Sequence, residues 1–506
     1  MPSFFMGIDN GGTMCKAVIF SASGKEIASA SSRLDMIRPQ SGFTERDMND
    51  LWSANCRIIK EAIDNAHISA EEIKGVACTG HGKGLYLWGK DGKPCYNGIV
   101  STDARAWMYP DKWSNDGTAE RVFEKTYQKI LACQPVSLLC WLKDNKPEVL
   151  PNVKWIFEVK DYIRFKLTDQ AYAEITDYSG SNLMNIKEVC FDRELLSEFG
   201  LSEFYDALPP LKNSMDFCGG VCKRASEETG LKEGTPLAGG MFDIDACAVA
   251  MDITNEDKIC VIAGTWSINE YISRQPVLNK TVMMNSLYCI PGYYLIEECS
   301  PTSASNYEWF IEMFLAEEKQ KAEELGINIF EYCNDQAEKV SVDEQNLIFL
   351  PYIFGSNYNP QAKASFIGLD SHHSRPQIIR AVLEGIVFCH MVHLEKLLAN
   401  RTKTLAIRLA GGAANSLFWA QIFADVLKLP VEIVDTKELG TLGCAMVAAV
   451  AAGVYKDLKE AARNMVKMKC RIEPNPDNYT IYEKKLALYK KVSNSLDALW
   501  RDFELT

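Results

Sequence analysis

Two short stretches of this chain share one pattern: an apolar run, a tight turn containing glycine and threonine, and a second β-rich run. Residues 4–8 lead through Asp9-Asn10-Gly11-Gly12-Thr13 into residues 14–20. In the middle of the chain, residues 258–263 lead through Gly264-Thr265-Trp266-Ser267 into a similar run. Glycine-rich turns between apolar runs predict β-hairpins. Because the same hairpin opens both halves, we expect a duplicated fold.

The length of the chain also requires more than one domain, because 506 residues exceed what one hydrophobic core supports. The polar, turn-like run Asp252-Ile253-Thr254-Asn255-Glu256-Asp257 precedes the second hairpin, and we place a domain boundary there, between residues 1–252 and 253–506. Elsewhere, predicted strands alternate with predicted helices, which favours an α/β architecture. The clearest alternation is strand 404–410, helix 415–428, strand 431–434 and helix 440–453.

Charge and composition argue against several classes of partner. The net charge is −13 and no stripe of Lys and Arg is present, so we expect neither nucleic acid nor an anionic membrane surface as partner. No run reaches the roughly 18 apolar residues that a membrane span needs. The 17 cysteines are odd in number and scattered without regular spacing. Such usage is typical of a reducing compartment, so we expect a cytoplasmic protein.

The two predicted hairpins could each face a phosphate group. Glycines lack a Cβ, so backbone N–H groups in such a turn can approach phosphate oxygens closely. At the first turn, Asp9 could hold Mg²⁺ through water, and the Thr13 hydroxyl could bond a phosphate. The second turn, with Gly264 and Thr265, would then supply a matching hairpin from the other domain. The alternative is an ordinary hairpin turn, because Asn and Gly favour turns in any case.

An aspartate follows a glycine pair in Gly239-Gly240-Met241-Phe242-Asp243, just before an Ala-rich apolar segment. This order predicts Asp243 at a helix N-terminus. There it could act as a general base that accepts a proton from a substrate hydroxyl. It could equally be the helix cap, since Asp is a favoured N-cap residue. Asp245 is a competing candidate for the base, and we expect it on a different side of the helix.

Another glycine pair stands between a predicted strand and a predicted helix, in Ala410-Gly411-Gly412-Ala413-Ala414-Asn415. A flat ligand can lie against a backbone that carries no side chains, and helix N-termini favour phosphate groups. Gly411, Gly412 and Asn415 are therefore candidate nucleotide contacts. The alternative is a tight strand-to-helix turn with Asn415 as the N-cap.

Two further runs combine small residues with charged ones. They are Gly80-His81-Gly82-Lys83-Gly84 and Ser101-Thr102-Asp103-Ala104-Arg105. The glycines leave room, while the His, Lys, Asp and Arg side chains can hydrogen-bond sugar hydroxyls or a carboxylate. The alternative is a solvated turn followed by a surface Asp/Arg pair.

In their order and spacing, these motifs resemble the FGGY family of carbohydrate kinases over nearly the whole chain, from Met6 to about Gly453. Further similar stretches are Thr44-Glu45-Arg46-Asp47, Leu350-Pro351-Tyr352-Ile353-Phe354-Gly355 and Arg380-Ala381-Val382-Leu383-Glu384-Gly385. The resemblance implies an α/β fold with two ribonuclease H-like, actin-like ATPase domains around a central cleft. It also implies ATP as the phosphoryl donor, Mg²⁺ as the cofactor and a small sugar as the substrate.

The functional residues of that family match positions in this sequence. The resemblance implies that Asp9 takes part in Mg²⁺ binding and that Asp243 is the catalytic base. It implies a set of nucleotide contacts made of both hairpins and the adenosine motif: Gly12, Thr13, Gly264, Thr265, Gly411, Gly412 and Asn415. The positions that it implies for the sugar pocket are His81, Lys83, Asp103 and Arg105.

Within the family, several stretches are most similar to kinases of L-xylulose and 3-keto-L-gulonate. They are Gly82-Lys83-Gly84-Leu85, Pro135-Val136-Ser137-Leu138-Leu139 and Ser300-Pro301-Thr302-Ser303-Ala304-Ser305-Asn306. The implied reaction is ATP-dependent phosphorylation of a hydroxyl of a small keto-sugar or sugar acid. The alternatives are a kinase for a related pentulose or polyol, such as D-xylulose or erythritol, and a non-catalytic actin-like ATP-binding protein. The resemblance also makes a homodimer plausible.

Overall fold

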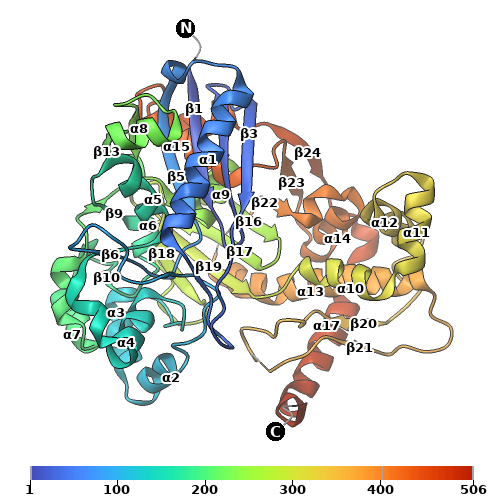
Figure 1. Cartoon of the computed structure of the whole chain (residues 1–506). Coiled ribbons are helices and arrows are strands. Elements are labelled where there is room, and N and C mark those ends of the chain that lie inside the picture. The colour runs from blue at the N-terminus through green and yellow to red at the C-terminus, as the bar shows by residue number, and fades with distance from the viewer. Residues whose placement is uncertain (1–2, 360, 402, 504–506) are drawn as a thin grey trace.

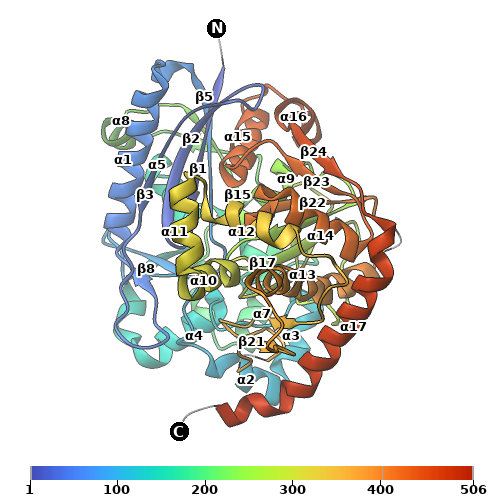
Figure 2. The ribbon, with the colours of Figure 1, turned by 90° about the vertical axis from the view of Figure 1, so that its right-hand side faces the viewer.

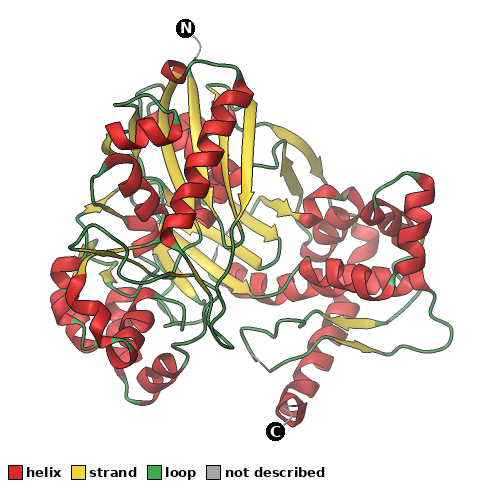
Figure 3. Cartoon of the chain, in the orientation of Figure 1, coloured by secondary structure: helices red, strands yellow, loops and turns green. Residues whose placement is uncertain are grey.

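The computed structural model describes residues 3–359, 361–401 and 403–503. In the part of the chain that it describes, two seven-stranded sheets dominate, one from each half of the sequence. Figure 3 shows these strands in the middle of the molecule with helices around them, and Figure 1 shows the two chain ends on opposite sides.

The N-terminal sheet begins with the predicted three-stranded meander. Its strands are β1 (Phe4–Asn10), β2 (Met14–Ser21), β3 (Glu26–Arg33), β5 (Ile73–Gly80), β13 (Phe217–Gly220), β14 (Pro236–Ala238) and β15 (Met241–Phe242). They run in the order β13-β14-β5-β1-β2-β3, with β15 also beside β5. β1 pairs antiparallel with β2 and parallel with β5. The first predicted hairpin is therefore confirmed.

Helix α1 (Met48–Ala66) lies against β2 and β3 (Figure 1). Asp47 caps it, since the carboxylate accepts hydrogen bonds from the backbone N–H groups of Asn49 and Asp50. Its buried apolar residues recur at helical spacing, as an amphipathic helix on a sheet requires. The helix ends at His67, which has the left-handed backbone conformation common after a last turn.

The C-terminal sheet repeats the same pairing pattern. Its strands are β16 (Lys258–Ala263), β17 (Ser267–Ser273), β18 (Met284–Leu287), β19 (Tyr294–Ser300), β22 (Ala406–Gly411), β23 (Val431–Val434) and β24 (Met468–Ile472). They run in the order β18-β19-β17-β16-β22-β23-β24. β16 pairs antiparallel with β17 and parallel with β22, just as β1 does with β2 and β5. The expected duplication is visible in this shared topology.

Helices α9 (Asp243–Ala250) and α15 (Leu439–Ala451) join the two halves. They share one hydrophobic cluster that also takes in residues from both sheets. α15 comes from the second half of the sequence yet packs on β1 and β5. Gly7 permits this close approach, because a Cβ there would lie 2.0 Å from the carbonyl oxygen of Thr441. The run 252–257 leads from α9 to β16, and a domain boundary at residue 252 stays a prediction.

The remaining elements surround these two sheets, with α17 along one edge (Figure 2). The other α-helices are α2 (Met108–Asn115), α3 (Thr118–Thr126), α4 (Pro135–Asn145), α5 (Val159–Thr168), α6 (Ile175–Tyr178), α7 (Arg193–Glu198), α8 (Lys223–Thr229), α10 (Ser305–Phe314), α11 (Ala316–Leu325), α12 (Ile329–Glu338), α13 (Arg375–Ala399), α14 (Leu417–Leu427), α16 (Leu458–Met465) and α17 (Tyr479–Leu496). The two-stranded sheets pair β4 (Glu45–Arg46) with β7 (Gly98–Ile99), β6 (Tyr86–Gly89) with β8 (Val153–Phe157), β9 (Ala173–Glu174) with β12 (Leu211–Lys212), β10 (Met184–Asn185) with β11 (Cys190–Phe191), and β20 (Ile348–Leu350) with β21 (Ser365–Ile367). The 3-10 turns are η1 (Ala70–Glu72), η2 (Pro147–Asn152), η3 (Ser202–Ala207), η4 (Gly412–Asn415), η5 (Pro476–Asn478) and η6 (Asp497–Phe503).

Helix α13 is long and apolar enough to cross a membrane by length and composition alone. However, 78% of its most apolar 18-residue window is buried inside the protein. Its residues join the core of the C-terminal half, where Ile379, Leu383 and Ile386 are fully buried. Burial to this extent is typical of a helix in the core of a folded protein.

Candidate active site

Three neighbouring parallel strands bring the predicted catalytic residues together. In the register of the sheet, Asn10 of β1 lies beside Gly80 of β5, and Gly80 lies beside Phe242 of β15. Asp9, His81 and Asp243 therefore gather where the carboxyl ends of these strands meet. Ligands commonly bind at this edge of α/β sheets.

Asp243 is the first residue of α9, and Phe242 occupies the cap position without a side-chain capping bond. The interpretation of Asp243 as the N-cap is therefore wrong by one residue. Burial raises the pKa of its carboxyl well above the ordinary value, and the nearby carboxylates of Asp9 and Asp177 raise it further. Lys83 acts in the opposite direction. A carboxyl whose pKa is shifted by burial and by nearby charges is typical of an acid–base residue in an active site.

Asp9 has the features of a cation ligand. Its Oδ1 atom is buried and has no hydrogen-bond partner among the described residues. Burial raises its pKa to about 6, although Lys16 opposes this effect. A Cβ at Gly440, near the start of α15, would lie 3.0 Å from its Oδ2 atom. In the part of the chain that is described, no group of three or more His, Cys, Asp or Glu side chains could hold a metal. Mg²⁺ usually takes only one or two carboxylates, with water and phosphate completing its shell, so Asp9 fits this ion.

Arg46 braces the first glycine turn. Its guanidinium donates hydrogen bonds to the carbonyl oxygens of Gly11, at 3.3 Å, and Gly12. The side chain is buried, whereas Thr13 at the tip of the turn is exposed. We assigned no role to Arg46 from the sequence, although it lies within the family-like stretch 44–47. Its burial next to a glycine turn depends on tertiary contacts that the sequence pattern does not reveal.

The second glycine turn and the adenosine motif are in direct contact. Ala263 of β16 is paired with Gly411 of β22. Gly411 has a φ of 81°, and a Cβ there would lie 2.3 Å from the carbonyl oxygen of Ala263 and 2.9 Å from the backbone nitrogen of Gly264. Only glycine fits this position. Thr265 is exposed at the tip, and its carbonyl oxygen accepts hydrogen bonds from Ser303 N and Ser305 Oγ, both at 3.1 Å.

A pocket of about 850 Å³ opens beside the adenosine motif. Gly412 and Asn415 line it, together with the rings of Tyr307, Phe330 and Trp419. Gly411 lines a smaller, adjoining pocket that shares Asn415. Apolar rings beside bare backbone suit a flat base.

The alternative reading of Asn415 as a helix cap is wrong. Asn415 ends the turn η4, and the cap of α14 is Ser416, whose Oγ accepts a hydrogen bond from Trp419 N at 3.2 Å. The Asn415 side chain is therefore not used to begin the helix. Ser416, one residue further along the chain, caps the helix instead, and serine is as favoured at this position as asparagine.

His81 is buried and neutral at physiological pH. Its Nε2 atom lies 3.0 Å from the hydroxyl of Tyr86. Burial lowers the pKa of its imidazole to about 3, and the positive charge of Arg46 contributes to the shift. In this environment His81 can position hydrogen bonds but carries no charge.

Lys83 lies between the two halves of the molecule. Its Nζ atom is 5.3 Å from the centre of the Phe242 ring, next to Asp243. Burial would lower the pKa of its ammonium group, but the carboxylate of Glu297 and, more weakly, that of Asp243 raise it above the ordinary value. Glu297 belongs to β19 of the C-terminal sheet, so groups from both halves of the molecule influence this pKa.

Asp103 and Arg105 form a buried pair, and the reading of them as a surface pair is wrong. They are 2% and 3% exposed. The guanidinium of Arg105 lies 2.8 Å from Asp103 and 2.7 Å from Glu45. It also stacks 4.1 Å from the centre of the Phe43 ring. Asp103 in turn accepts a hydrogen bond from Thr44 N at 2.7 Å, which helps to hold the pair in place.

Two glutamates at the site were missed from the sequence. Glu270 of β17 and Glu297 of β19 are buried and lie opposite each other in the sheet. Both carboxylate oxygens of Glu270 and Oε2 of Glu297 have no hydrogen-bond partner among the described residues. A signal was available, because Glu297 and Glu298 interrupt an otherwise apolar strand, and buried charges in strands usually have a function.

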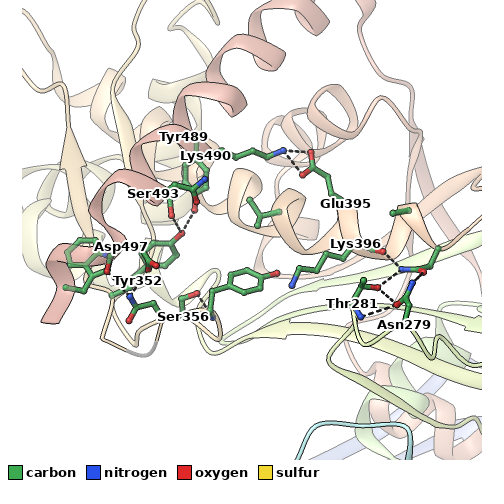
Figure 4. Close-up of a pocket in the computed structure, with 18 residues that line it drawn as sticks. Asn279, Thr281, Tyr352, Ser356, Glu395, Lys396, Tyr489, Lys490, Ser493 and Asp497 are labelled. Carbon is green, nitrogen blue, oxygen red and sulfur yellow. Dashed lines mark hydrogen bonds and ion pairs between the residues drawn. The ribbon is translucent and has the colours of Figure 1, made fainter. Parts of the chain in front are cut away.

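A further cavity, of about 700 Å³, lies elsewhere, between α13 and α17 (Figure 4). The Tyr352 hydroxyl is 3.1 Å from both Tyr489 Oη and Ser493 Oγ, and Lys490 pairs with Glu395. None of the predicted site residues lines this cavity. The candidate active site is therefore at the strand ends.

Comparisons with known proteins agree with this geometry. Models of the N-terminal and C-terminal domains of the FGGY family of carbohydrate kinases match residues 4–250 and 259–452. The chain is 31% identical over 501 residues to a probable L-xylulose kinase of Pasteurella multocida (strain Pm70), covering 98% of this chain and 100% of that protein. It is 32% identical over 497 residues to the L-xylulose/3-keto-L-gulonate kinase of Escherichia coli (strain K12), covering 98% of each chain.

A solved structure of another carbohydrate kinase is similar over the whole chain. The crystal structure of gluconate kinase from Lactobacillus acidophilus is 25% identical and superposes with a TM-score of 0.90, covering 100% of both chains. This likeness confirms the predicted α/β fold with two actin-like, ribonuclease H-like domains. Both family models match in order, on either side of the run 252–257, and the motifs meet at one set of strand ends. The chain therefore belongs to the FGGY family of carbohydrate kinases, which use ATP to phosphorylate sugars.

Proposed function

We propose that this kinase phosphorylates a hydroxyl of a small keto-sugar or sugar acid, with L-xylulose and 3-keto-L-gulonate as the leading candidates. The observation that carries the proposal is the meeting of Asp243, Asp9 and Lys83 at the ends of neighbouring strands. The names of the relatives from Pasteurella multocida and Escherichia coli support the choice of sugar.

Asp243 acts as the general base. Its carboxylate accepts the proton of the sugar hydroxyl while that oxygen bonds to the γ-phosphorus of ATP and the bond from phosphorus to ADP breaks. The raised pKa of Asp243 suits this task, because a carboxylate with a higher proton affinity takes up the hydroxyl proton more readily. His81, Lys83, Asp103 and Arg105 bind and orient the sugar.

The two glycine turns bind the phosphates from opposite sides. Gly12 and Thr13 approach from the N-terminal half, and Gly264 and Thr265 from the C-terminal half. Gly411, Gly412 and Asn415 hold the adenosine in the adjoining pockets. Asp9 would hold Mg²⁺ through water, and the bound ion would neutralise charge on the phosphates. Because positioning supplies most of the catalysis, the two halves close around the substrates.

A substrate panel tests this function directly. ADP release with MgATP should be measured with L-xylulose, 3-keto-L-gulonate, D-xylulose, L-ribulose, xylitol, erythritol and glycerol. We expect strong stimulation by L-xylulose or 3-keto-L-gulonate and weak stimulation by the polyols. Stimulation by erythritol or D-xylulose alone would assign the chain to the alternative substrate. ADP release that no sugar changes would contradict the proposal as a whole.

Replacing Asp9 by asparagine should weaken the response to Mg²⁺. The amide is neutral and attracts the ion less strongly, so we expect the Mg²⁺ concentration for half-maximal activity to rise about ten-fold or more, a loss near 1.4 kcal/mol. The measurement is a Mg²⁺ titration of activity, with Mg²⁺-dependent ADP binding by calorimetry as a second readout. Asp35→Asn, on a surface loop, is the control. An unchanged Mg²⁺ response in Asp9→Asn would show that Asp9 does not hold the ion.

We also propose a cytoplasmic location, which agrees with the finding that all 17 cysteines are free thiols. The homodimer remains a prediction, and sedimentation of the purified protein would test it.

A further inference from the structure

We propose that His390 of α13 is a positioning residue for ATP, because its imidazole links the second glycine turn to the loop that holds Thr265. This inference rests on the proposed function, in which that turn binds the phosphates of ATP, and deepens it. His390 acts through two serines. One is Ser267, at the end of the turn, and the other is Ser303, on the loop that precedes α10.

The second glycine turn depends on support from outside. Thr265 and Trp266 at its tip are exposed, and one backbone hydrogen bond, from Gly264 N to Trp266 O at 3.2 Å, closes the turn. The carbonyl oxygen of Thr265 accepts hydrogen bonds from Ser303 N and Ser305 Oγ, both at 3.1 Å. Backbone N–H groups bind a phosphate well only when the backbone is already held in place. The position of Ser303 therefore affects how the turn meets a phosphate.

His390 contacts both sides of this arrangement. Its Nε2 atom lies 2.7 Å from Ser303 Oγ. Its Nδ1 atom lies 3.0 Å from Ser267 Oγ and 2.8 Å from Asn269 Oδ1. All four side chains are buried, and a buried polar group that loses its partner is costly. The imidazole thus holds the turn and the loop at a fixed separation.

The neighbouring contacts determine which ring nitrogen carries the proton. The backbone oxygen of Glu298 can only accept, and Asn269 Nδ2 lies 3.2 Å from it, so the side-chain oxygen of Asn269 faces His390. Nδ1 of His390 then donates to that oxygen, and Nε2 accepts the hydrogen of the Ser303 hydroxyl. Burial lowers the pKa of His390 to about 3, which keeps the ring neutral at physiological pH. A neutral ring has one donor and one acceptor, and both are used here.

The loop that carries Ser303 also reaches the adenosine motif. The Cβ atom of Ala304, the next residue, would lie 3.2 Å from a Cβ at Gly412. Ala304 and Gly412 both line the pocket of about 850 Å³. A shift of this loop would therefore disturb the nucleotide site at two places. The residues proposed for the sugar come from the N-terminal half, so we expect His390 to affect the nucleotide more than the sugar.

Replacing His390 by phenylalanine tests the inference. Phenylalanine keeps a ring beside Phe423 but can neither donate nor accept a hydrogen bond. We expect Kd for the non-hydrolysable ATP analogue AMP-PNP, measured by calorimetry with Mg²⁺, to rise about ten-fold, as does KM for ATP. The sugar KM at saturating ATP should change much less. Unchanged affinity for AMP-PNP in a variant that is folded by circular dichroism would overturn the inference.

A second pair of variants decides the question if His390→Phe does not fold. Ser303→Ala removes the hydroxyl but keeps the N–H group that holds Thr265, and it should also raise Kd for AMP-PNP. His390→Gln keeps an acceptor for the Ser303 hydroxyl, so its Kd should lie nearer the wild-type value. Because linked residues act as one unit, Ser303→Ala should have little further effect in His390→Gln if glutamine fails to restore the contact. Wild-type affinity in Ser303→Ala would contradict the link.

His393→Gln is the matched control. His393 lies one turn further along α13 and is equally buried, but its Nδ1 atom lies 3.0 Å from Glu298 Oε2 and from the hydroxyl of Tyr358. Neither partner belongs to the second glycine turn, so we expect wild-type affinity for AMP-PNP. Equal losses in His393→Gln and His390→Phe would show that packing of α13 is the cause, and would overturn the inference.

The binding experiment needs no sugar, so it can fail independently of the proposed function. If no sugar of the panel stimulates ADP release while His390→Phe weakens AMP-PNP binding, the proposed function fails and the role of His390 stands. If a sugar stimulates ADP release and His390→Phe binds AMP-PNP normally, the kinase function stands and this inference fails.

Discussion

Replacing Asp243 by asparagine should reduce sugar-dependent kcat by about 10²–10⁴-fold, the range that a positioned general base supplies. Asparagine has nearly the same shape but cannot accept the hydroxyl proton. The KM values for sugar and ATP should change little, since the binding groups remain. The measurement is steady-state ADP release with the best sugar of the panel. A variant with near-normal kcat would show that another group takes the proton.

The Asp243→Asn variant should be at least as stable as the wild type. A loss of its activity can then be attributed to catalysis and not to unfolding. A carboxyl whose pKa is higher in the folded protein than in the unfolded chain holds its proton more tightly when folded. At pH 7, which is above the ordinary pKa of an aspartate, ionisation of such a carboxyl therefore lowers the free energy of unfolding. Burial and Asp9 raise the pKa of Asp243 in this way. We expect the thermal midpoint of Asp243→Asn at pH 7 to equal or exceed that of the wild type.

Asp245→Asn is the matched control for this experiment. Asp245 lies two residues further along α9 and is fully buried. Its Oδ1 atom accepts a hydrogen bond from Cys289 N at 3.0 Å, so it is engaged in the core. We expect Asp245→Asn to keep kcat within about ten-fold of the wild type, far less than the loss of a general base. A larger loss in Asp245→Asn than in Asp243→Asn would exchange their roles.

Replacing Gly411 by alanine should weaken the use of ATP strongly. The new Cβ would lie 2.3 Å from the carbonyl oxygen of Ala263 and 2.9 Å from Gly264 N. Backbone must move at the second phosphate turn to relieve this collision, because neither neighbour is a flexible side chain. We expect KM for ATP to rise about ten-fold or more, which corresponds to a loss near 1.4 kcal/mol. The sugar KM at saturating ATP should change less.

Gly453→Ala is the control for backbone strain alone. Gly453 also has a positive φ, of 74°, but nothing lies within 4 Å of its Cβ position. Both variants place alanine at a positive φ, which strains the backbone, and the ψ of −161° at Gly411 belongs to a region that only glycine adopts readily. Only Gly411→Ala adds the collision at the phosphate turn. If both variants raise KM for ATP equally, general destabilisation rather than displacement of the turn is the cause.

The hairpins and the alternating elements could be predicted from the sequence because they depend on local patterns. Predicted strand 431–434 agrees with β23, and the predicted hairpin turns at Gly11 and Gly264 are where the strands reverse. The exact starts of two helices could not be predicted: Ser416 caps α14 instead of Asn415, and Phe242 precedes α9 without a side-chain capping bond. Neighbouring residues can both fit a helix start, so the sequence alone leaves a shift of one residue open.

Charge pairing at the site could not be predicted, because it joins distant parts of the chain. Arg105 pairs with Glu45, which comes from the strand that precedes β5 in the sequence. Lys83 and Glu297 belong to different halves, and the effect of Glu297 on the pKa of Lys83 arises only after both sheets have formed. The sequence shows which residue types could bind a sugar. The net charge around a bound substrate, however, depends on which charged groups pair in the folded protein.

Strand β19 has a practical consequence for anyone who wishes to redesign this enzyme. Glu297 lies opposite Glu270 in the sheet, while Glu298 contacts His393, Tyr358 and Lys396. Successive side chains of a strand lie on opposite faces of the sheet, so positions 297 and 298 contact different neighbours. A library that randomises position 297 and keeps Glu298 fixed can vary the charge that acts on Lys83 without disturbing the contact between β19 and α13.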